Sequence, residues 1–291
     1  MKMRVLILGI DALEYDLVEE WDLKNLKQKE YGKICVPIPE GFIEPATMIV
    51  WLCFITGQPP ERMGYSQPVL YRWPFNFLFD LYFKTLCKSG DIHPEDIMKK
   101  RGKKREVLDR ISDICKKMNI SYDPKKKNIK AETFFDNDQI KSTHFHIPAY
   151  DDAFPKYRNK IVDVLTKKIS EKEFSQECKQ VYKYRCEELD EYLQTNNDWN
   201  LIMMYWFCLD GVQHALFRKK LKIMDYYLMF NEYVGRLSKE LSKDTLILIV
   251  SDHGQKKGIH TNHGFYSSNK KLGLKNPDIT DFKEIIEKTI D

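Results

Sequence analysis

Three short apolar segments in this 291-residue sequence each end in an aspartate. The residues are Asp11 after 5–10, Asp210 after 201–209, and Asp252 after 246–250 and one serine. In an open α/β sheet, ligands bind beyond the carboxyl ends of the strands. Each aspartate alone could instead cap the helix that follows it, because a carboxylate there accepts bonds from free backbone N–H groups. Three of them at three strand ends favour one shared metal site.

Histidines lie close to two of these aspartates. His214 follows Asp210 by four residues, and His253 follows Asp252 directly. His260 and His263 come within the next ten residues. Divalent ions such as Zn²⁺ and Mn²⁺ bind mixtures of carboxylate and imidazole ligands. The sequence therefore predicts a divalent metal site and leaves zinc and manganese as alternatives.

Thr47 is the candidate for a reacting group. The segment Glu44-Pro45-Ala46 leads into a nearly all-apolar helix, expected at 47–56, and places the threonine hydroxyl at its N-terminus. Free N–H groups and the helix dipole favour an anion such as phosphate there, and a metal on the same oxygen would favour the alkoxide. The alternative is that Thr47 only caps the helix.

The elements that must position these residues alternate between strands and helices. Strands are expected at 5–10, 33–37, 143–147, 198–209, 245–250 and 265–268. Helices are expected at 16–30, 47–56, 156–194, 224–241 and 279–290, the second ending at Gly57. This alternation predicts an α/β fold with a mostly parallel sheet sandwiched between helices.

The chain divides by composition into a core and an insertion. Residues 1–69 and 140–291 carry the strand and helix pattern, whereas 70–139 hold an aromatic stretch and clusters of lysine and arginine. We expect 70–139 to form a small helical cap. Its aromatic residues either line a substrate cleft or only pack the cap on the core. Its basic clusters either form solvated helix faces or contact phosphate or nucleic acid.

Composition bears on where in the cell the protein is located and on whether it binds nucleic acid or a membrane. The 47 basic and 43 acidic residues leave a formal charge of +4, which by itself does not argue for nucleic acid. Seven scattered cysteines without a Cys-x-x-Cys pair suit a reducing cytosol. The first apolar stretch is too short for a signal peptide, and no run approaches the roughly 18 residues that span a bilayer. We expect a soluble, cytoplasmic protein without a membrane partner.

Taken together, the motifs resemble those of the type I phosphodiesterase and nucleotide pyrophosphatase family, within the alkaline phosphatase superfamily. The matching residues are Gly9-Ile10-Asp11, Thr47 with Thr56-Gly57 and Pro59-Pro60 beyond it, Asp210-x-x-x-His214, and Ser251-Asp252-His253-Gly254. The ten-residue step from Thr47 to Gly57 and the Ser-Asp-His-Gly motif are specific in this order. The resemblance covers both ends of the chain but not 70–139, and it implies an alkaline phosphatase-like core.

The resemblance also implies roles. Thr47 would be the nucleophile, and two divalent ions would be held by two ligand sets: Asp11, Thr47, Asp252 and His253 for one, and Asp210, His214 and a late histidine for the other. His260, four residues before Gly264, matches the spacing of many superfamily members, and we favour it. His263, directly before Gly264, is the alternative and resembles the nucleotide pyrophosphatases. Paired metals can clamp the attacking and leaving oxygens of an in-line displacement, with a phosphothreonine ester that water then hydrolyses.

Two positions depart from the family pattern. Met63 precedes Gly64 where the family often has histidine, and Pro68 stands where it often has an asparagine that steadies the phosphoryl oxygen. Gln67, or a lysine of the cap, is the candidate substitute for substrate binding. The loss of one such donor can cost on the order of 10²-fold in rate.

The sequence thus predicts a two-metal-dependent phosphodiesterase or nucleotide pyrophosphatase whose substrate is a small anionic phosphoester such as a nucleotide. One alternative keeps the metals and makes the enzyme a phosphomonoesterase or a phosphoryl transferase. Another is a metal-stabilised protein that binds phosphate or nucleotide with little turnover. Sulfatase activity is disfavoured, because those enzymes need a cysteine or serine at the position of Thr47. That hydroxyl favours catalysis, since a purely structural metal site does not require it.

Overall fold

The computed structural model describes residues 3–39, 44–63, 129, 131–151, 157–165 and 167–290. Six strands form its central sheet: β1 (Arg4–Ile10), β2 (Glu30–Cys35), β3 (Ser142–Phe145), β4 (Leu201–Trp206), β5 (Thr245–Ser251) and β8 (His263–Ser268). Their order is β2-β8-β5-β1-β4-β3. β5, β1, β4 and β3 are mutually parallel, and β8 is antiparallel to both of its neighbours. The sheet is therefore mixed but mostly parallel.

The three central strands end at the same edge of the sheet. Residues 5–10, 201–206 and 245–251 are buried throughout, as expected for parallel strands covered on both faces. In the pairing register, Ile10 lies beside Trp206 and Gly9 beside Val250. The segments that follow β1, β4 and β5 consequently begin close together.

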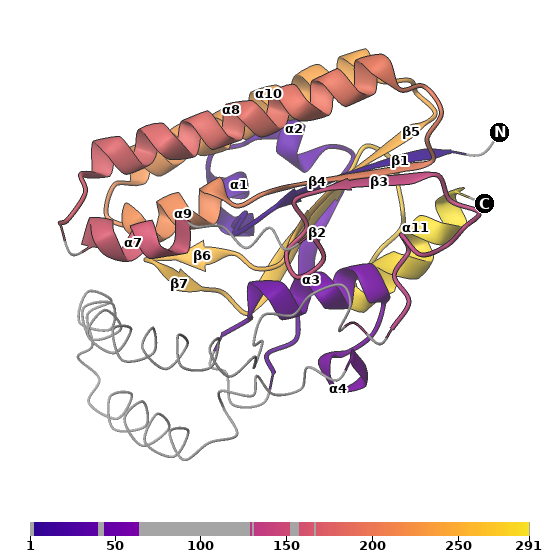
Figure 1. Ribbon diagram of the computed structural model, residues 1–291, viewed down its shortest axis with the longest axis horizontal. Helices are drawn as coiled ribbons and strands as arrows, with labels where there is room; N and C mark the ends of the chain where they lie inside the picture. The colour runs from indigo at the N-terminus through magenta and orange to yellow at the C-terminus, as the bar shows by residue number, and fades with distance from the viewer. Residues whose placement is uncertain are drawn as a thin grey trace, which may run out of the picture.

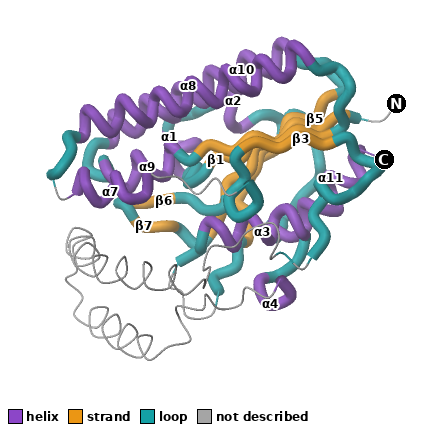
Figure 2. Tube along the Cα trace, in the orientation of Figure 1, coloured by secondary structure: helices purple, strands orange, loops and turns teal. Residues whose placement is uncertain are grey.

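Helices cover both faces of the sheet (Figures 1 and 2). They are α1 (Tyr15–Glu20), α2 (Lys24–Lys27), α3 (Thr47–Thr56), α4 (Pro60–Met63), α7 (Tyr157–Leu165), α8 (Glu171–Thr195), α9 (Cys208–Ala215), α10 (Lys220–Glu240) and α11 (Phe282–Ile290), with a 3₁₀ turn at Ile279–Asp281. Figure 1 shows α8 and α10 on one side and α3 and α11 on the other. On β4, Trp206 packs against Phe230 of α10, whereas Tyr205 packs against Trp51 of α3. The predicted α/β fold class is confirmed.

Helix α3 is the buried helix that the sequence predicts. Its residues from Ile49 onward are buried, and it ends at Gly57, whose φ of 63° is left-handed. Phe134 is fully buried against Phe54 and donates its backbone N–H to Ile55 O at 3.0 Å. The described residues 131–139 thus contact the core. Apart from Ile129, which packs against the core, the rest of the predicted cap lies outside the described residues, as do Gln67 and Pro68.

Two segments that were each predicted as one continuous helix form two separate helices. The segment 16–30 forms α1 and α2, separated by Asp22 with a φ of 46°, and β2 already begins at Glu30. The segment 156–194 forms α7 and α8. Ser170 begins the second of these helices, because its hydroxyl accepts the N–H of Glu173 at 3.1 Å. The helical periodicity continues on both sides of the break, so the sequence pattern did not reveal Ser170 as the N-cap of a new helix.

The strand predicted at 198–209 is too long. β4 ends at Trp206, and α9 begins at Cys208, so that Asp210 lies in the first turn of a helix. Phe207, Cys208 and Leu209 are apolar because they are buried at the start of α9, and they extend the apolar run of the strand. A buried strand and a buried helix cannot be separated by apolarity alone.

A two-stranded hairpin, absent from the predicted elements, stands apart from the main sheet (Figures 1 and 2). It pairs β6 (Gln255–Lys256) with β7 (Ile259–His260). Lys257 and Gly258 form its loop with φ values of 52° and 80°, the two positive angles of the hairpin turn whose twist matches the strands. This hairpin carries His260.

No described helix combines the length and the apolarity needed to cross a membrane. Five cysteines fall within the described residues, and all five are free thiols. Four of them are buried and Cys35 is exposed.

Candidate metal centre

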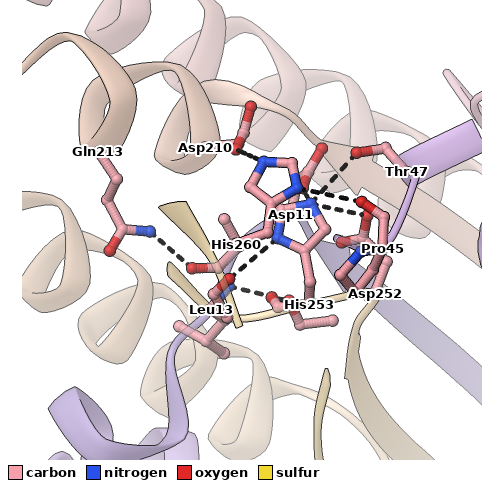
Figure 3. Close-up of polar contacts among 12 residues, drawn as sticks. Asp11, Leu13, Pro45, Thr47, Asp210, Gln213, Asp252, His253 and His260 are labelled. Carbon is pink, nitrogen blue, oxygen red and sulfur yellow. Dashed lines mark hydrogen bonds and ion pairs between the residues drawn. The ribbon is translucent and has the colours of Figure 1, made fainter. Parts of the chain in front are cut away.

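One group of polar residues gathers where β1 and β5 end and α3 begins. We call Asp11, Thr47, Asp252 and His253 the strand-end cluster (Figure 3). His253 Nε2 lies 3.3 Å from Asp11 Oδ1, 3.3 Å from Asp252 Oδ2 and 3.2 Å from Thr47 Oγ1. Asp11, Asp252 and His253 are fully buried. Three oxygens therefore converge on a single ring nitrogen away from water.

The hydrogen bond of the other ring nitrogen, Nδ1, determines whether His253 Nε2 carries a hydrogen or a lone pair. Nδ1 lies 3.1 Å from Gly254 O, and a carbonyl only accepts, so Nδ1 carries the hydrogen. Burial, together with the neighbouring His260, lowers the pKa of His253 to about 3, so the ring is neutral. Nε2 then presents a lone pair. Among the described residues, Asp11 Oδ1 and both Asp252 oxygens have no hydrogen-bond partner. Facing lone pairs of this kind fit a bound cation.

The carboxylates of Asp11 and Asp252 repel each other when no cation is bound between them. Burial, with repulsion from Asp252 and Asp210, raises the pKa of Asp11 well above its ordinary value. Burial likewise raises the pKa of Asp252 to about 7, and Asp210 adds to it. Tyr205 donates its hydroxyl to Asp11 Oδ2 at 2.5 Å and leaves Oδ1 facing His253. Burial thus favours the neutral form of both carboxyl groups, and a bound cation would favour their ionised form.

Thr47 is free of the capping role that the sequence left open. Ala46 is the N-cap of α3, with φ and ψ of −107° and 112°, and no side chain caps this helix. Thr47 is the first helical residue, and its hydroxyl contacts His253 instead. The interpretation of Thr47 as a helix cap is wrong. Its hydroxyl stands at a helix N-terminus, where the dipole favours an anion.

A second group lies beside the first and comes from α9 and the hairpin. We call Asp210, His214 and His260 the helix–hairpin cluster. Asp210 and His214, four residues apart, share one face of α9, and His214 Nε2 lies 3.1 Å from Asp210 Oδ1. His260 Nε2 lies 3.5 Å from the same oxygen and 2.9 Å from His214 Nε2.

Backbone carbonyls fix both histidines of the helix–hairpin cluster. His214 Nδ1 contacts Gly258 O at 3.0 Å, and His260 Nδ1 contacts Pro45 O at 3.1 Å. Both Nε2 atoms are therefore turned inward, as in metal-ligating histidines whose other nitrogen donates to a carbonyl. All three histidines of the centre share this arrangement.

Charge is better balanced in this second group. Burial opposes ionisation of Asp210, but His214 and His260 hold its pKa well below the ordinary value. Although burial opposes it, Asp210 raises the pKa of His260 to about 8. Asp210 thus favours a second proton on His260, whose Nε2 lies 2.9 Å from His214 Nε2. A metal ion would take the place of that proton.

The two clusters are adjacent. The rings of His253 and His260 stack with centroids 3.7 Å apart at 16°. Ligand atoms of Asp11, Asp210 and His253 all lie within 4.8 Å of one another, as do those of Asp210, His214 and His260. The two candidate metal-binding groups therefore lie side by side and share Asp210.

His263 faces away from this centre. Its Nε2 lies 3.4 Å from Glu14 Oε1, whereas His260 reaches Asp210 and His214. The structure thus brings His260, and not His263, to the helix–hairpin cluster. The metal-binding roles of these residues stay predictions.

Sequence analysis missed two residues that support the centre. Glu14 is fully buried, caps α1 by accepting the N–H of Asp16 at 3.1 Å, and accepts the hydroxyl of Thr261 at 3.1 Å. Glutamate is not a favoured N-cap, so no pattern pointed to it. Tyr205 had a signal, because a tyrosine inside a buried strand needs a partner for its hydroxyl.

Other residues singled out in the sequence lie elsewhere. Met63 is fully buried, and its sulfur accepts the hydroxyl of Thr56 at 3.2 Å, so this position serves packing beneath α3. His144 and His146, on and after β3, pair with Asp151 and Glu188, each at 2.7 Å. These pairs belong to the far edge of the sheet.

A sequence model of the family described as type I phosphodiesterase / nucleotide pyrophosphatase matches residues 5–269. The chain belongs to this family. The matched range contains every residue of the strand-end and helix–hairpin clusters. No curated protein matches the sequence in a direct search.

Several solved structures are similar at low identity. Murine ectonucleotide pyrophosphatase/phosphodiesterase 5 matches 86% of this chain at 12% identity with a TM-score of 0.41, and this chain spans 57% of its length. The protein PH0037 from Pyrococcus horikoshii matches over 100% of this chain and 97% of its own, at 11% identity and a TM-score of 0.46. The alkaline phosphatase of the Antarctic bacterium TAB5 matches over 100% and 98%, at 9% identity and a TM-score of 0.43. The family assignment rests on the sequence model.

Proposed function

We propose that this protein is a two-metal-dependent phosphodiesterase or nucleotide pyrophosphatase that forms a phosphothreonine at Thr47. One observation carries the proposal. Thr47 Oγ1 lies 3.2 Å from His253 Nε2, the ring nitrogen that also faces the carboxylates of Asp11 and Asp252. A hydroxyl in such a donor set, at a helix N-terminus, suits a nucleophile for phosphorus.

The residues of the two clusters are the proposed metal ligands. The strand-end cluster would hold one ion and the helix–hairpin cluster the other, and Zn²⁺ or Mn²⁺ suits these donors. Bound ions would supply Lewis acidity that neutralises charge on the attacking and leaving oxygens. Tyr205, through its 2.5 Å bond, orients Asp11 toward the centre.

The covalent steps follow from the position of Thr47. Its oxygen forms a bond to phosphorus as the bond to the leaving alcohol or phosphate breaks, and the hydroxyl proton passes through solvent to the leaving oxygen. Water then attacks the phosphothreonine, breaks the bond between phosphorus and Thr47, and restores the hydroxyl. The N-terminus of α3 stabilises the negative phosphoryl group in both steps.

The substrate is expected to be a small anionic phosphoester such as a nucleotide. The predicted cap, Gln67 and the basic clusters, which lie outside the described residues, bear on its identity. Contact with nucleic acid and a cytoplasmic location stay predictions from the sequence.

Hydrolysis of bis(p-nitrophenyl) phosphate and p-nitrophenyl phosphate, with Zn²⁺ or Mn²⁺, tests this proposal in the wild type, Thr47→Ala and Thr47→Ser. We expect metal-dependent cleavage of the diester that is lost in Thr47→Ala and partly kept in Thr47→Ser, while the remaining ligands of both clusters keep metal bound. Thr195→Ala, near the end of α8, is a matched control with wild-type activity.

Other outcomes separate the alternatives. Equal diester cleavage by Thr47→Ala would remove the threonine as nucleophile. A preference for the monoester would identify a phosphomonoesterase. Metal binding without cleavage of either ester would favour a binding protein or a substrate that neither ester represents.

A further inference from the structure

Gln255 is a buried side chain that belongs to neither cluster. It begins β6 and is 2% exposed, and neither its Nε2 nor its Oε1 has a hydrogen-bond partner among the described residues. Buried amides are almost always bonded, because an unpartnered polar group has lost its water and gained nothing. An unpartnered amide at a functional site suggests that its partner is a ligand.

A second glutamine shows the contrast. Gln213 of α9 is equally buried, with 3% exposed. Its Nε2 donates to Ala12 O at 2.6 Å (Figure 3). Its Oε1 accepts the hydroxyl of Tyr227 at 3.3 Å. Gln213 therefore joins elements of the core, whereas the amide of Gln255 bonds to no group in the part of the chain that the structure describes.

The pairing of the hairpin shows which way Gln255 faces. Gln255 is directly opposite His260 in the antiparallel pair, and opposed residues place their side chains on the same face. The side chain of His260 reaches Asp210 and His214. Gln255 thus lies on the hairpin face that carries the helix–hairpin cluster.

The neighbouring residues confirm this direction, because successive residues of a strand alternate between faces. A Cβ on Gly254 would lie 2.2 Å from Glu14 Oε2, and Thr261 donates to that same oxygen. Lys256 pairs with Asp16, two residues after Glu14. The face opposite Gln255 is therefore the one that packs on the Glu14 segment.

We propose that Gln255 is a substrate-binding residue whose Nε2 donates a hydrogen bond to a non-bridging oxygen of the phosphoester. The amide is neutral, so it does not compete with the carboxylates for metal, and its two N–H groups suit an anionic oxygen. This inference rests on the proposed function and adds a residue to the same site.

Gln255→Leu tests the inference, with Gln255→Met as a second variant of similar length and Gln213→Leu as the matched control. Loss of a hydrogen bond to a charged group should lower kcat/KM for bis(p-nitrophenyl) phosphate by about 10- to 100-fold. The affinity of the zinc-loaded protein for inorganic phosphate, measured by calorimetry, should fall by a similar factor. Zinc content should stay at the wild-type level.

Thermal unfolding separates this role from a structural one. Gln255→Leu removes two unpartnered buried atoms, so the melting temperature of the metal-free variant should equal or exceed that of the wild type. Gln213→Leu removes the donor to Ala12 O and the acceptor of the Tyr227 hydroxyl hydrogen, and it should lower the melting temperature. A fall in Gln255→Leu and Gln255→Met like that of Gln213→Leu would overturn the inference.

Unchanged phosphate affinity in both Gln255 variants would also overturn it. Phosphate affinity requires no turnover. If the wild type binds phosphate but cleaves neither ester, hydrolysis through Thr47 fails, while the ratio of phosphate affinities still decides the role of Gln255.

Discussion

The strand-end cluster and the helix–hairpin cluster differ in what holds them in place. The first follows β1 and β5, two central strands, and its Asp11, Asp252 and His253 side chains are 0% exposed. The second comes from α9 and from a hairpin with two residues in each strand, and its side chains are 8–13% exposed. Central strands hold one half of the centre, and a buried helix together with a short hairpin completes it.

The clusters also differ in charge. The strand-end cluster sets two carboxylates against a neutral histidine, whereas Asp210 in the other cluster faces His260, whose pKa is raised to about 8. A cation adds a missing charge in the first and replaces a proton in the second. We therefore expect tighter metal binding in the strand-end cluster.

The largest expected effect comes from Asp252→Asn. Loss of a carboxylate ligand should lower kcat for the diester on the order of 10³-fold, because several kcal/mol of charge stabilisation is lost. Without metal the same change removes a buried repulsion, so the free energy of unfolding should rise. Urea denaturation in a chelator measures it, and Asp198→Asn, which is exposed, is the control. An Asp252→Asn variant that is both active and less stable would contradict the charge difference between the two clusters.

A smaller effect distinguishes the two late histidines. His260→Gln should release one of two bound metal equivalents and lower kcat/KM by about 10²-fold, whereas His263→Gln should keep both equivalents. Elemental analysis after dialysis gives the stoichiometry. Loss of metal from His263→Gln alone would instead indicate that the second metal site includes His263 and lies beside Glu14.

The smallest effect concerns stability and pH. The pKa of Asp252 is raised from 3.8 to about 7 in the folded, metal-free protein. The folded state therefore holds a proton that the unfolded state releases, and the free energy of unfolding should fall as pH rises between about 4 and about 7. Bound zinc should remove this fall, and Asp252→Asn should reduce it. A profile with chelator that rises over this range would contradict the assignment.

The strand-end cluster was the part of the centre that sequence could predict. Asp11 and Asp252 follow apolar runs that are long enough to be strands, and the family and fold class are confirmed. Asp210 was misplaced because the apolar run of β4 continues into α9. The hairpin was missed because its strands are short and partly charged. Glu14 and Gln255 follow no pattern, since their burial depends on residues distant in the sequence.

Anomalous diffraction from zinc-loaded crystals tests the central claim most directly. We expect two peaks about 3.5 to 4 Å apart, one among Asp11, Thr47, Asp252 and His253 and the other among Asp210, His214 and His260. A single peak shared by Asp11, Asp210 and His253, or a peak beside His263, would contradict the division into two clusters.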